Sequence, residues 1–209
     1  MHKRPGIALP RVLATLASAL VLAGLLAGCS SSSSSSSSAS GASASGFDGA
    51  ALPAAAPAHG FELTDQDRRA VSLSRYRGQV TIIAFLYSTC GATCILIAQQ
   101  VRGALDELPH PVPVLFISAE PRADTPAHVR SFLAQVSLTG RVRYLSGSLA
   151  MLRPVWSAFR IVPATAGRSA AFERSASVLL LDREGRERVL FQLEQLTPEG
   201  LAHDVRKLL

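Results

Sequence analysis

Apolar residues follow two different patterns from residue 80 to the end of this chain. Unbroken runs rich in β-branched residues occur at 80–87 (VTIIAFLY) and at 112–119 (VPVLFISA), as in strands buried on both faces. A shorter run, VRYLSG at 142–147, predicts a third strand. Apolar residues spaced by three or four positions predict helices at 91–108, 126–136, 148–159 and 198–209.

Two turns between short stretches of strand-forming residues predict β-hairpins. The first hairpin spans 61–73 with its turn at 65–67, and the second joins 177–182 to 187–192 across the turn REGR. The order is therefore hairpin, βαβ, αβ, α, hairpin, α, which is typical of an α/β domain with helices covering a mixed sheet. We expect residues 59–209 to form this one domain.

The N-terminal segment has the features of an export signal. Lys3, Arg4 and Arg11 precede an apolar run at 12–26, which ends in Leu-Ala-Gly directly before Cys29. Small residues before a cysteine are similar to a bacterial lipoprotein signal, which implies cleavage after residue 28 and lipidation of Cys29. The alternative is a plain transmembrane anchor, but a run of about 15 residues is short beside the roughly 20 that a spanning helix needs.

The residues after Cys29 have the composition of a flexible tether. Nine consecutive serines, at 30–38, are followed by Ala, Ser, Gly and Pro as far as Pro57. Such a segment buries too little apolar surface to offset the entropy of ordering it. We therefore expect a disordered tether over 29–58, which lets an exported, lipid-anchored domain work on the extracytoplasmic or periplasmic side at some distance from the membrane.

The charge of the chain changes once the signal is removed. The formal net charge of +6 includes three cations and no acids from the first 28 residues, so that the mature chain carries +3. Nearly all of its cations are arginines, and they are scattered rather than interleaved with aromatic residues. Because single-stranded nucleic acid needs a basic groove with stacking aromatics, we exclude nucleic acid as a partner.

Cys90 and Cys94 stand where the strand at 80–87 gives way to the helix at 91–108. A cysteine at a helix N-terminus has its thiolate stabilised by free N–H groups and by the helix dipole. Four residues later Cys94 lies on the same helical face, so that the pair can close a disulfide or bind one soft ion such as Cu(I). The alternative is two buried thiols without a role. Zinc lacks the remaining ligands of a four-coordinate site. A central strand followed by a helix with a cysteine at the junction is the thioredoxin-like plan.

At this point the sequence resembles the Sco (SenC) family of thioredoxin-fold proteins, which serve copper delivery and thiol redox in cytochrome c oxidase assembly. Five stretches carry the resemblance in order: VSLSRYRGQVTIIAFLYSTCGATC, FISAEPRADTPAHVRSFL, YLSGSLAMLRPVWSAFRI, RSASVLLLDREGR and LTPEGLAHDVRKLL. The resemblance implies that Cys90 is the attacking thiolate, that Cys94 is the resolving thiol, and that both are copper ligands. It also implies cysteine-bearing protein clients, among them a cytochrome oxidase subunit.

The sequence departs from the family pattern at four positions. Gly91 and Ile95 follow the two cysteines where the family usually has proline, and Glu120 stands where an aspartate is usual. Arg174, in Arg-Ser-Ala, replaces the copper-ligand histidine of the family's His-Ser-Ala. Since arginine stays protonated and supplies no nitrogen ligand, we expect Cu(I) to be favoured over Cu(II). An arginine beside the thiols would also lower a cysteine pKa, which favours thiol–disulfide exchange.

The other polar candidates have two interpretations each. Glu120 is either a proton relay for exchange or a cap of the turn at Asp124. The four histidines of residues 59–209 are expected at the surface rather than as ligands: His59, His110, His128 and His203. Met151 is a weak candidate thioether ligand, and Trp156 is expected in the core.

Two other functions remain open from the residues alone. A general thioredoxin-like reductase or peroxiredoxin is disfavoured by the CxxxC spacing and by the absence of proline directly before the late strand, since Pro163 is too far upstream. A degenerate binding module on the same fold would instead use its surface and leave the cysteines inert. Whether the chain is a thiol–disulfide oxidoreductase or a copper chaperone without turnover stays open at this stage.

Overall fold

The computed structural model describes residues 46–53, 57–165 and 170–209. In these residues a mixed sheet has the strand order β1-β8-β7-β4-β5-β6, and β2 and β3 form a separate two-stranded sheet. The strands of the large sheet are β1 (Ala50–Ala51), β4 (Thr81–Leu86), β5 (Val114–Ser118), β6 (Arg143–Leu145), β7 (Ser177–Leu181) and β8 (Glu187–Gln192). The hairpin consists of β2 (Glu62–Thr64) and β3 (Ala70–Ser72). The expected α/β fold with a central mixed sheet and an N-terminal hairpin is confirmed.

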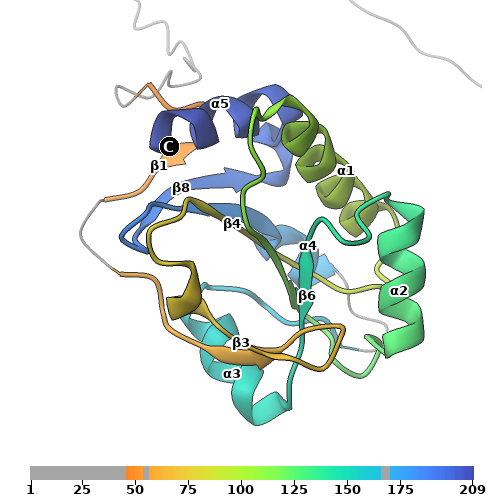
Figure 1. Ribbon diagram of the computed structural model, residues 1–209. Helices are drawn as coiled ribbons and strands as arrows, with labels where there is room; N and C mark the ends of the chain where they lie inside the picture. The colour runs from red at the N-terminus through yellow and green to blue at the C-terminus, as the bar shows by residue number, and fades with distance from the viewer. Residues whose placement is uncertain (1–45, 54–56, 166–169) are drawn as a thin grey trace, which may run out of the picture. The chain divides into compact units, whose positions relative to one another are not determined.

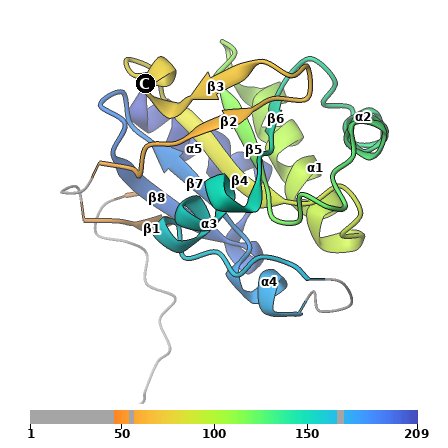
Figure 2. The same cartoon turned by 90° about the horizontal axis from the view of Figure 1, so that it is seen from below.

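The helices lie on both sides of the large sheet. They are α1 (Ala92–Glu107), α2 (Pro126–Gln135), α3 (Leu149–Ala158), α4 (Ala170–Ser175) and α5 (Pro198–Leu208), with 3-10 turns at η1 (Leu73–Tyr76) and η2 (Leu193–Gln195). Figures 1 and 2 show α1 and α5 together on one face, and α3 with the β2–β3 hairpin on the other. Of these helices, α4 has no counterpart in the sequence prediction.

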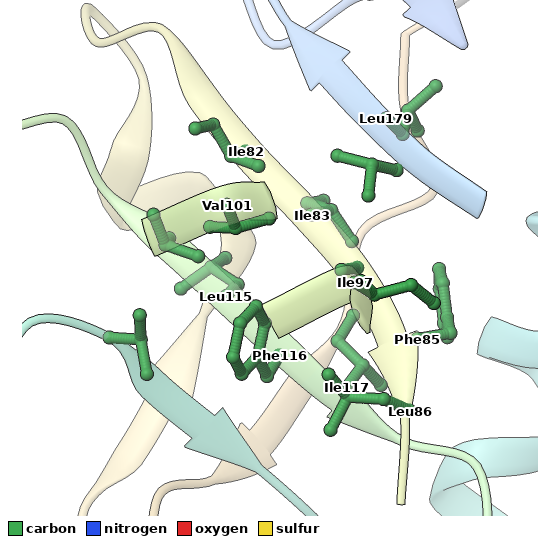
Figure 3. Close-up of a cluster of buried hydrophobic side chains, with 14 of the residues drawn as sticks. Ile82, Ile83, Phe85, Leu86, Ile97, Val101, Leu115, Phe116, Ile117 and Leu179 are labelled. Atoms are coloured by element: carbon green, nitrogen blue, oxygen red, sulfur yellow. The ribbon is translucent and has the colours of Figure 1, made fainter. Parts of the chain in front are cut away.

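The central strands β4 and β5 are parallel and buried along their whole length. Their register pairs Ile82 with Val114 and Leu86 with Ser118, so that both strands end at the same edge of the sheet. Figure 3 shows Ile97 and Val101 of α1 lying over these strands. Full burial of one such aliphatic side chain contributes about 2 kcal/mol. The junction between β4 and α1 is therefore anchored in the hydrophobic core.

The buried face of α1 agrees only in part with the expected one. The apolar spacing predicted a face through Ile95, Ala98, Val101, Leu105 and Leu108, of which Ala98 and Val101 are buried and the other three are only partly buried. The buried residues are Cys94, Ile97, Ala98, Val101 and Ala104. Because a cysteine counts as a small apolar residue in a core, the face begins at Cys94. The second cysteine of the pair therefore points into the protein.

The folded unit begins earlier than the expected boundary at residue 59. Ala50 and Ala51 form β1, which pairs antiparallel with Leu190 and Val189 of β8. The carboxylate of Asp204 on α5 also accepts hydrogen bonds from the backbone N–H groups of Asp48 and Gly49, at 2.9 Å each. The expected disordered tether over 29–58 is therefore wrong for 46–53, because main-chain pairing orders a segment whose composition predicts disorder. The signal, Cys29 and the serine run lie outside the described residues.

Candidate functional site at the CxxxC turn

The CxxxC turn connects the buried end of β4 to the first turn of α1. Tyr87 is still buried, and its carbonyl accepts a hydrogen bond of 3.2 Å from the Cys90 N–H. Gly91 is the N-cap of α1, has φ of +74°, and gives no side-chain hydrogen bond to the helix. The first N–H groups of α1 therefore have no capping side chain, which leaves them available to a thiolate at Cys90.

Gly91 explains one departure from the family pattern in physical terms. A φ of +74° is accessible to glycine but not to proline, whose ring fixes φ near −65°. The turn of this chain therefore has a conformation that the usual proline could not adopt. A Cβ added at Gly91 would meet no atom within 4 Å, so the constraint lies in the backbone and not in side-chain space.

Cys90 and Cys94 are joined by a disulfide in the structure. Their Cα atoms are 5.8 Å apart, which is an ordinary separation for a disulfide. Cys94 is completely buried, whereas Cys90 is half-buried. The two sulfurs are therefore unequal, since only that of Cys90 is open to an approaching thiol.

A buried aspartate, Asp124, supports this turn and was not identified from the sequence as part of the site. Its carboxylate accepts hydrogen bonds from the Ser88 N–H at 2.6 Å, the Ser118 hydroxyl at 2.5 Å and the Tyr144 hydroxyl at 2.8 Å. Burial raises the pKa of this carboxyl above its usual value, although the three hydrogen bonds oppose the shift. Asp124 does not cap the following helix: the N-cap of α2 is Thr125, whose hydroxyl accepts the His128 N–H.

Acidic side chains surround the start of the CxxxC turn. Burial raises the pKa of Tyr87, and the negative charges of Glu120, Glu173 and Asp124 raise it further, in that order. Glu120 is half-buried and its side chain makes no hydrogen bond within the described residues. The turn before Asp124 is closed instead by the Glu120 backbone carbonyl, which accepts the N–H groups of Ala123 and Asp124. The Glu120 side chain therefore does not cap this turn.

The helix α4 places Phe172 against the CxxxC turn, whereas its Arg174 lines a separate cavity. The Phe172 ring packs edge-on against Tyr87, with centroids 5.3 Å apart. Arg174 is exposed and lines a cavity of about 250 Å³ with Phe85, Phe159 and Glu187, and neither cysteine lines this cavity. We expected Arg174 beside the thiols, but among the described residues no contact joins it to Cys90 or Cys94.

The donor groups at the turn fit a soft, two-coordinate ion and not a site with three protein ligands. Among the described residues, the cluster of three or more ligating side chains is Asp48, His203 and Asp204, which contains neither cysteine. The four histidines and Met151 are exposed, as expected for the histidines: His59, His110, His128 and His203. Two reduced thiols are a donor set that Cu(I) accepts.

The fold and the paired cysteines together define a thioredoxin-fold dithiol protein. Within the described residues, no helix is both long enough and apolar enough to cross a membrane. The chain belongs to the SCO1/SenC family, whose model matches residues 50–209. This match confirms the resemblance seen in the sequence. A comparison with curated proteins gave no match.

Solved structures of the same family are similar to this chain. The copper-bound ScoI of Bradyrhizobium japonicum is 30% identical, with a TM-score of 0.56, and the alignment covers 74% of this chain and 100% of that one. BsSco, a member of the Sco family of cytochrome c oxidase assembly proteins in which a disulfide switch was identified, is 19% identical with a TM-score of 0.63 and coverages of 73% and 92%. A SCO1/SenC family lipoprotein from Bacillus anthracis is 19% identical with a TM-score of 0.59 and coverages of 73% and 94%. Because BsSco and the Bacillus anthracis protein are only 19% identical to this chain, their similarity shows the fold alone.

Proposed function

We propose that this chain is a membrane-anchored, Sco-like thiol–disulfide protein that acts on cysteines of partner proteins during cytochrome c oxidase assembly. The observation that carries the proposal is the unequal pair at the turn, a half-buried Cys90 bonded to a fully buried Cys94. Membership of a family of cytochrome c oxidase assembly proteins supports the choice of pathway. The disulfide switch identified in BsSco supports redox chemistry at the cysteine pair of this chain.

The chemistry is a two-step exchange in which two electrons pass between the protein and its client. In the reducing direction, the Cys90 thiolate attacks a client disulfide, forms a Cys90–client bond and releases one client thiolate. The Cys94 thiolate then attacks the Cys90 sulfur, closes the Cys90–Cys94 disulfide and releases the second client thiolate. The free N–H groups at the start of α1 stabilise the attacking thiolate. The oxidising direction is the same sequence reversed.

Copper enters the proposal as cargo bound by the reduced pair. Two thiolates hold Cu(I), as its preference for soft ligands requires, while Cu(II) lacks the nitrogen ligand that Arg174 replaces. Copper-bound ScoI supports metal binding in the family. The acidic groups near Tyr87 would oppose a thiolate but favour a cation at this turn.

The membrane anchor is the lipid on Cys29, in an exported protein whose domain lies on the extracytoplasmic or periplasmic side. The lipoprotein from Bacillus anthracis supports this arrangement. The variant Cys29→Ser should move the protein from the membrane fraction to the soluble fraction and abolish labelling with radioactive palmitate. Unchanged labelling and fractionation would show that Cys29 is not the anchor.

The proposal is tested in cells that lack this gene and therefore assemble less cytochrome c oxidase. Wild-type protein should restore oxidase activity, whereas Cys90→Ser and Cys94→Ser should leave it at the level of the deletion. His128→Ser is the control, since this exposed side chain lies outside the turn. Full restoration by both cysteine variants would favour a binding module that does not use the thiols.

A further inference from the structure

A cavity of about 310 Å³ lies at the same edge of the sheet as the CxxxC turn and is not used by the exchange chemistry. The carbonyl of Leu86 at the end of β4 accepts the N–H of Ala119, so the segment after β5 leaves the sheet beside the segment that leads to Cys90. That segment supplies Glu120 and Arg122 to the cavity. The N–H of Ala164 donates to Ala119 and brings the third wall to the same edge.

One wall of the cavity is a face of α3 that carries two large hydrophobic side chains, Leu149 and Trp156. Leu149, Arg153 and Trp156 are spaced by four and three residues along α3, so that they share one face of that helix. The Trp156 indole is buried and its N–H donates to the Ser118 carbonyl at 2.8 Å, which fixes the ring. Leu149 remains 37% exposed at the cavity, where it offers an apolar surface for contact.

Two arginines at the cavity have no partner within the described part of the chain. Arg122 and Arg153 are exposed and form no hydrogen bond or ion pair with described residues. Six other described arginines form ion pairs, as Arg143 does with buried Asp65 at 2.6 Å. Glu120 is the one acidic side chain among the residues lining the cavity. The cavity therefore combines an apolar wall with an excess of positive charge.

We propose that this cavity is the client-docking site, and that it receives an apolar side chain of the client flanked by aspartate or glutamate. The apolar side chain packs on Trp156 and Leu149, while the acidic neighbours pair with Arg122 and Arg153. This inference rests on the proposed function, because it supplies the docking step that precedes exchange at Cys90. The charge of the two arginines and the apolar surface of the cavity define the client segment: an apolar residue with acidic neighbours.

Binding is measured without any thiol chemistry through Trp156, the only tryptophan of the chain. The full-length protein, held in solution by an amphipol, is titrated with the capped peptide Asp-Phe-Asp-Gly-Ser-Gly and with its counterpart carrying Lys in place of both Asp. Tryptophan emission should saturate with the acidic peptide at a Kd at least about tenfold lower than with the basic one. The double variant Arg122→Gln, Arg153→Gln should reduce this preference to less than about twofold.

The control variant is Arg130→Gln on α2, which removes an exposed arginine outside the cavity and should keep the tenfold preference. Equal binding of both peptides by the wild type would overturn the proposal, as would a preference that survives in the double variant. Saturation by dodecanoate but not by the acidic peptide would show a site for fatty acids instead. Exchange of the Cys90–Cys94 disulfide with dithiothreitol is followed in parallel, because its absence would contradict the proposed function and leave the docking result standing.

Discussion

The carboxylate of Asp124 accepts a hydrogen bond of 2.6 Å from the backbone N–H of Ser88, two residues before Cys90. This bond joins the loop after β5 to the turn after β4, and the same carboxylate also receives the hydroxyls of Ser118 and Tyr144. Tyr144 keeps its proton for this bond, since burial and the charge of Asp124 raise its pKa well above the usual value. The position of the redox turn thus depends on one buried carboxyl group.

Asp124→Ala should destabilise the oxidised protein by about 3 kcal/mol, because it leaves one backbone N–H and two hydroxyls without their acceptor. Asp124→Asn should cost less, about 1–2 kcal/mol, since its carbonyl oxygen still accepts the Ser88 N–H. Urea unfolding monitored by circular dichroism gives both values. Changes below about 0.5 kcal/mol in both variants would show that the network does not support the fold.

The pH dependence of the Asp124→Asn effect has a predictable sign. Burial raises the folded-state pKa of Asp124 above the unfolded value, so the native protein binds more protons than the unfolded chain between those two pKa values. The contribution of Asp124 to stability is therefore fully present below the unfolded pKa and is lost as pH rises through the folded pKa. The stability difference between wild type and Asp124→Asn should be larger at pH 3.5 than at pH 7, and a difference that grows with pH would contradict this assignment.

Gly91→Ala tests the left-handed backbone at the start of α1. The added methyl group meets no neighbouring atom, so the cost is that of the backbone conformation alone, φ +74° and ψ −140°, about 1–3 kcal/mol. Gly60→Ala is the matched control, because its Cβ also meets no atom within 4 Å and its φ lies outside the left-handed region. In the oxidised state, the denaturant midpoint of Gly91→Ala should be clearly lower than that of Gly60→Ala. Equal midpoints would mean that the turn relaxes without cost.

The two cysteines should differ in reactivity once the disulfide is reduced. Cys90 is half-buried whereas Cys94 is fully buried, so iodoacetamide should modify Cys90 first by at least about tenfold. Peptide mapping by mass spectrometry at short reaction times gives the ratio, and Cys94→Ser should leave the rate at Cys90 nearly unchanged. Faster modification of Cys94 would reverse the proposed roles of attacking and resolving thiol.

Arg174→His tests whether position 174 is the third ligand position of the family. If it is, this variant should bind Cu(II) at least about a hundredfold more tightly than wild type, with nitrogen ligation in its electron paramagnetic resonance spectrum. Arg160→His is the control, because Arg160 lines the same cavity as Arg174. Tight Cu(II) binding with nitrogen ligation by the wild type would contradict the preference for Cu(I).

The parts of the site that the sequence predicted correctly are those fixed by local pattern. The continuous apolar run of β4, followed by helical spacing, placed the cysteines at a strand–helix junction, and the structure has them there. The histidines were expected at the surface from their places at the domain edge, in a proline-rich loop, on a helix and near the C-terminus, and that is where they lie. Both conclusions depend on residues close together in the chain.

The parts that the sequence did not predict depend on distant contacts. Asp124 precedes Thr-Pro, a typical helix start, and only its bond to Ser88, 36 residues away, distinguishes it from a cap. The two alanines of β1 have no strand propensity and are ordered by β8, some 140 residues later. The helix α4 has six residues and buries a single phenylalanine, which is too short a segment for a periodic signal.

The central claim is that Cys90 and Cys94 form a reversible dithiol–disulfide couple in the folded protein. Its most direct test is a redox titration of the full chain against dithiothreitol, with the free thiols counted by alkylation and mass spectrometry at each potential. The account predicts one reversible two-electron transition that is absent from Cys90→Ser and Cys94→Ser, while circular dichroism shows the fold intact on both sides of it. A disulfide that is reduced only when the protein unfolds would contradict the account.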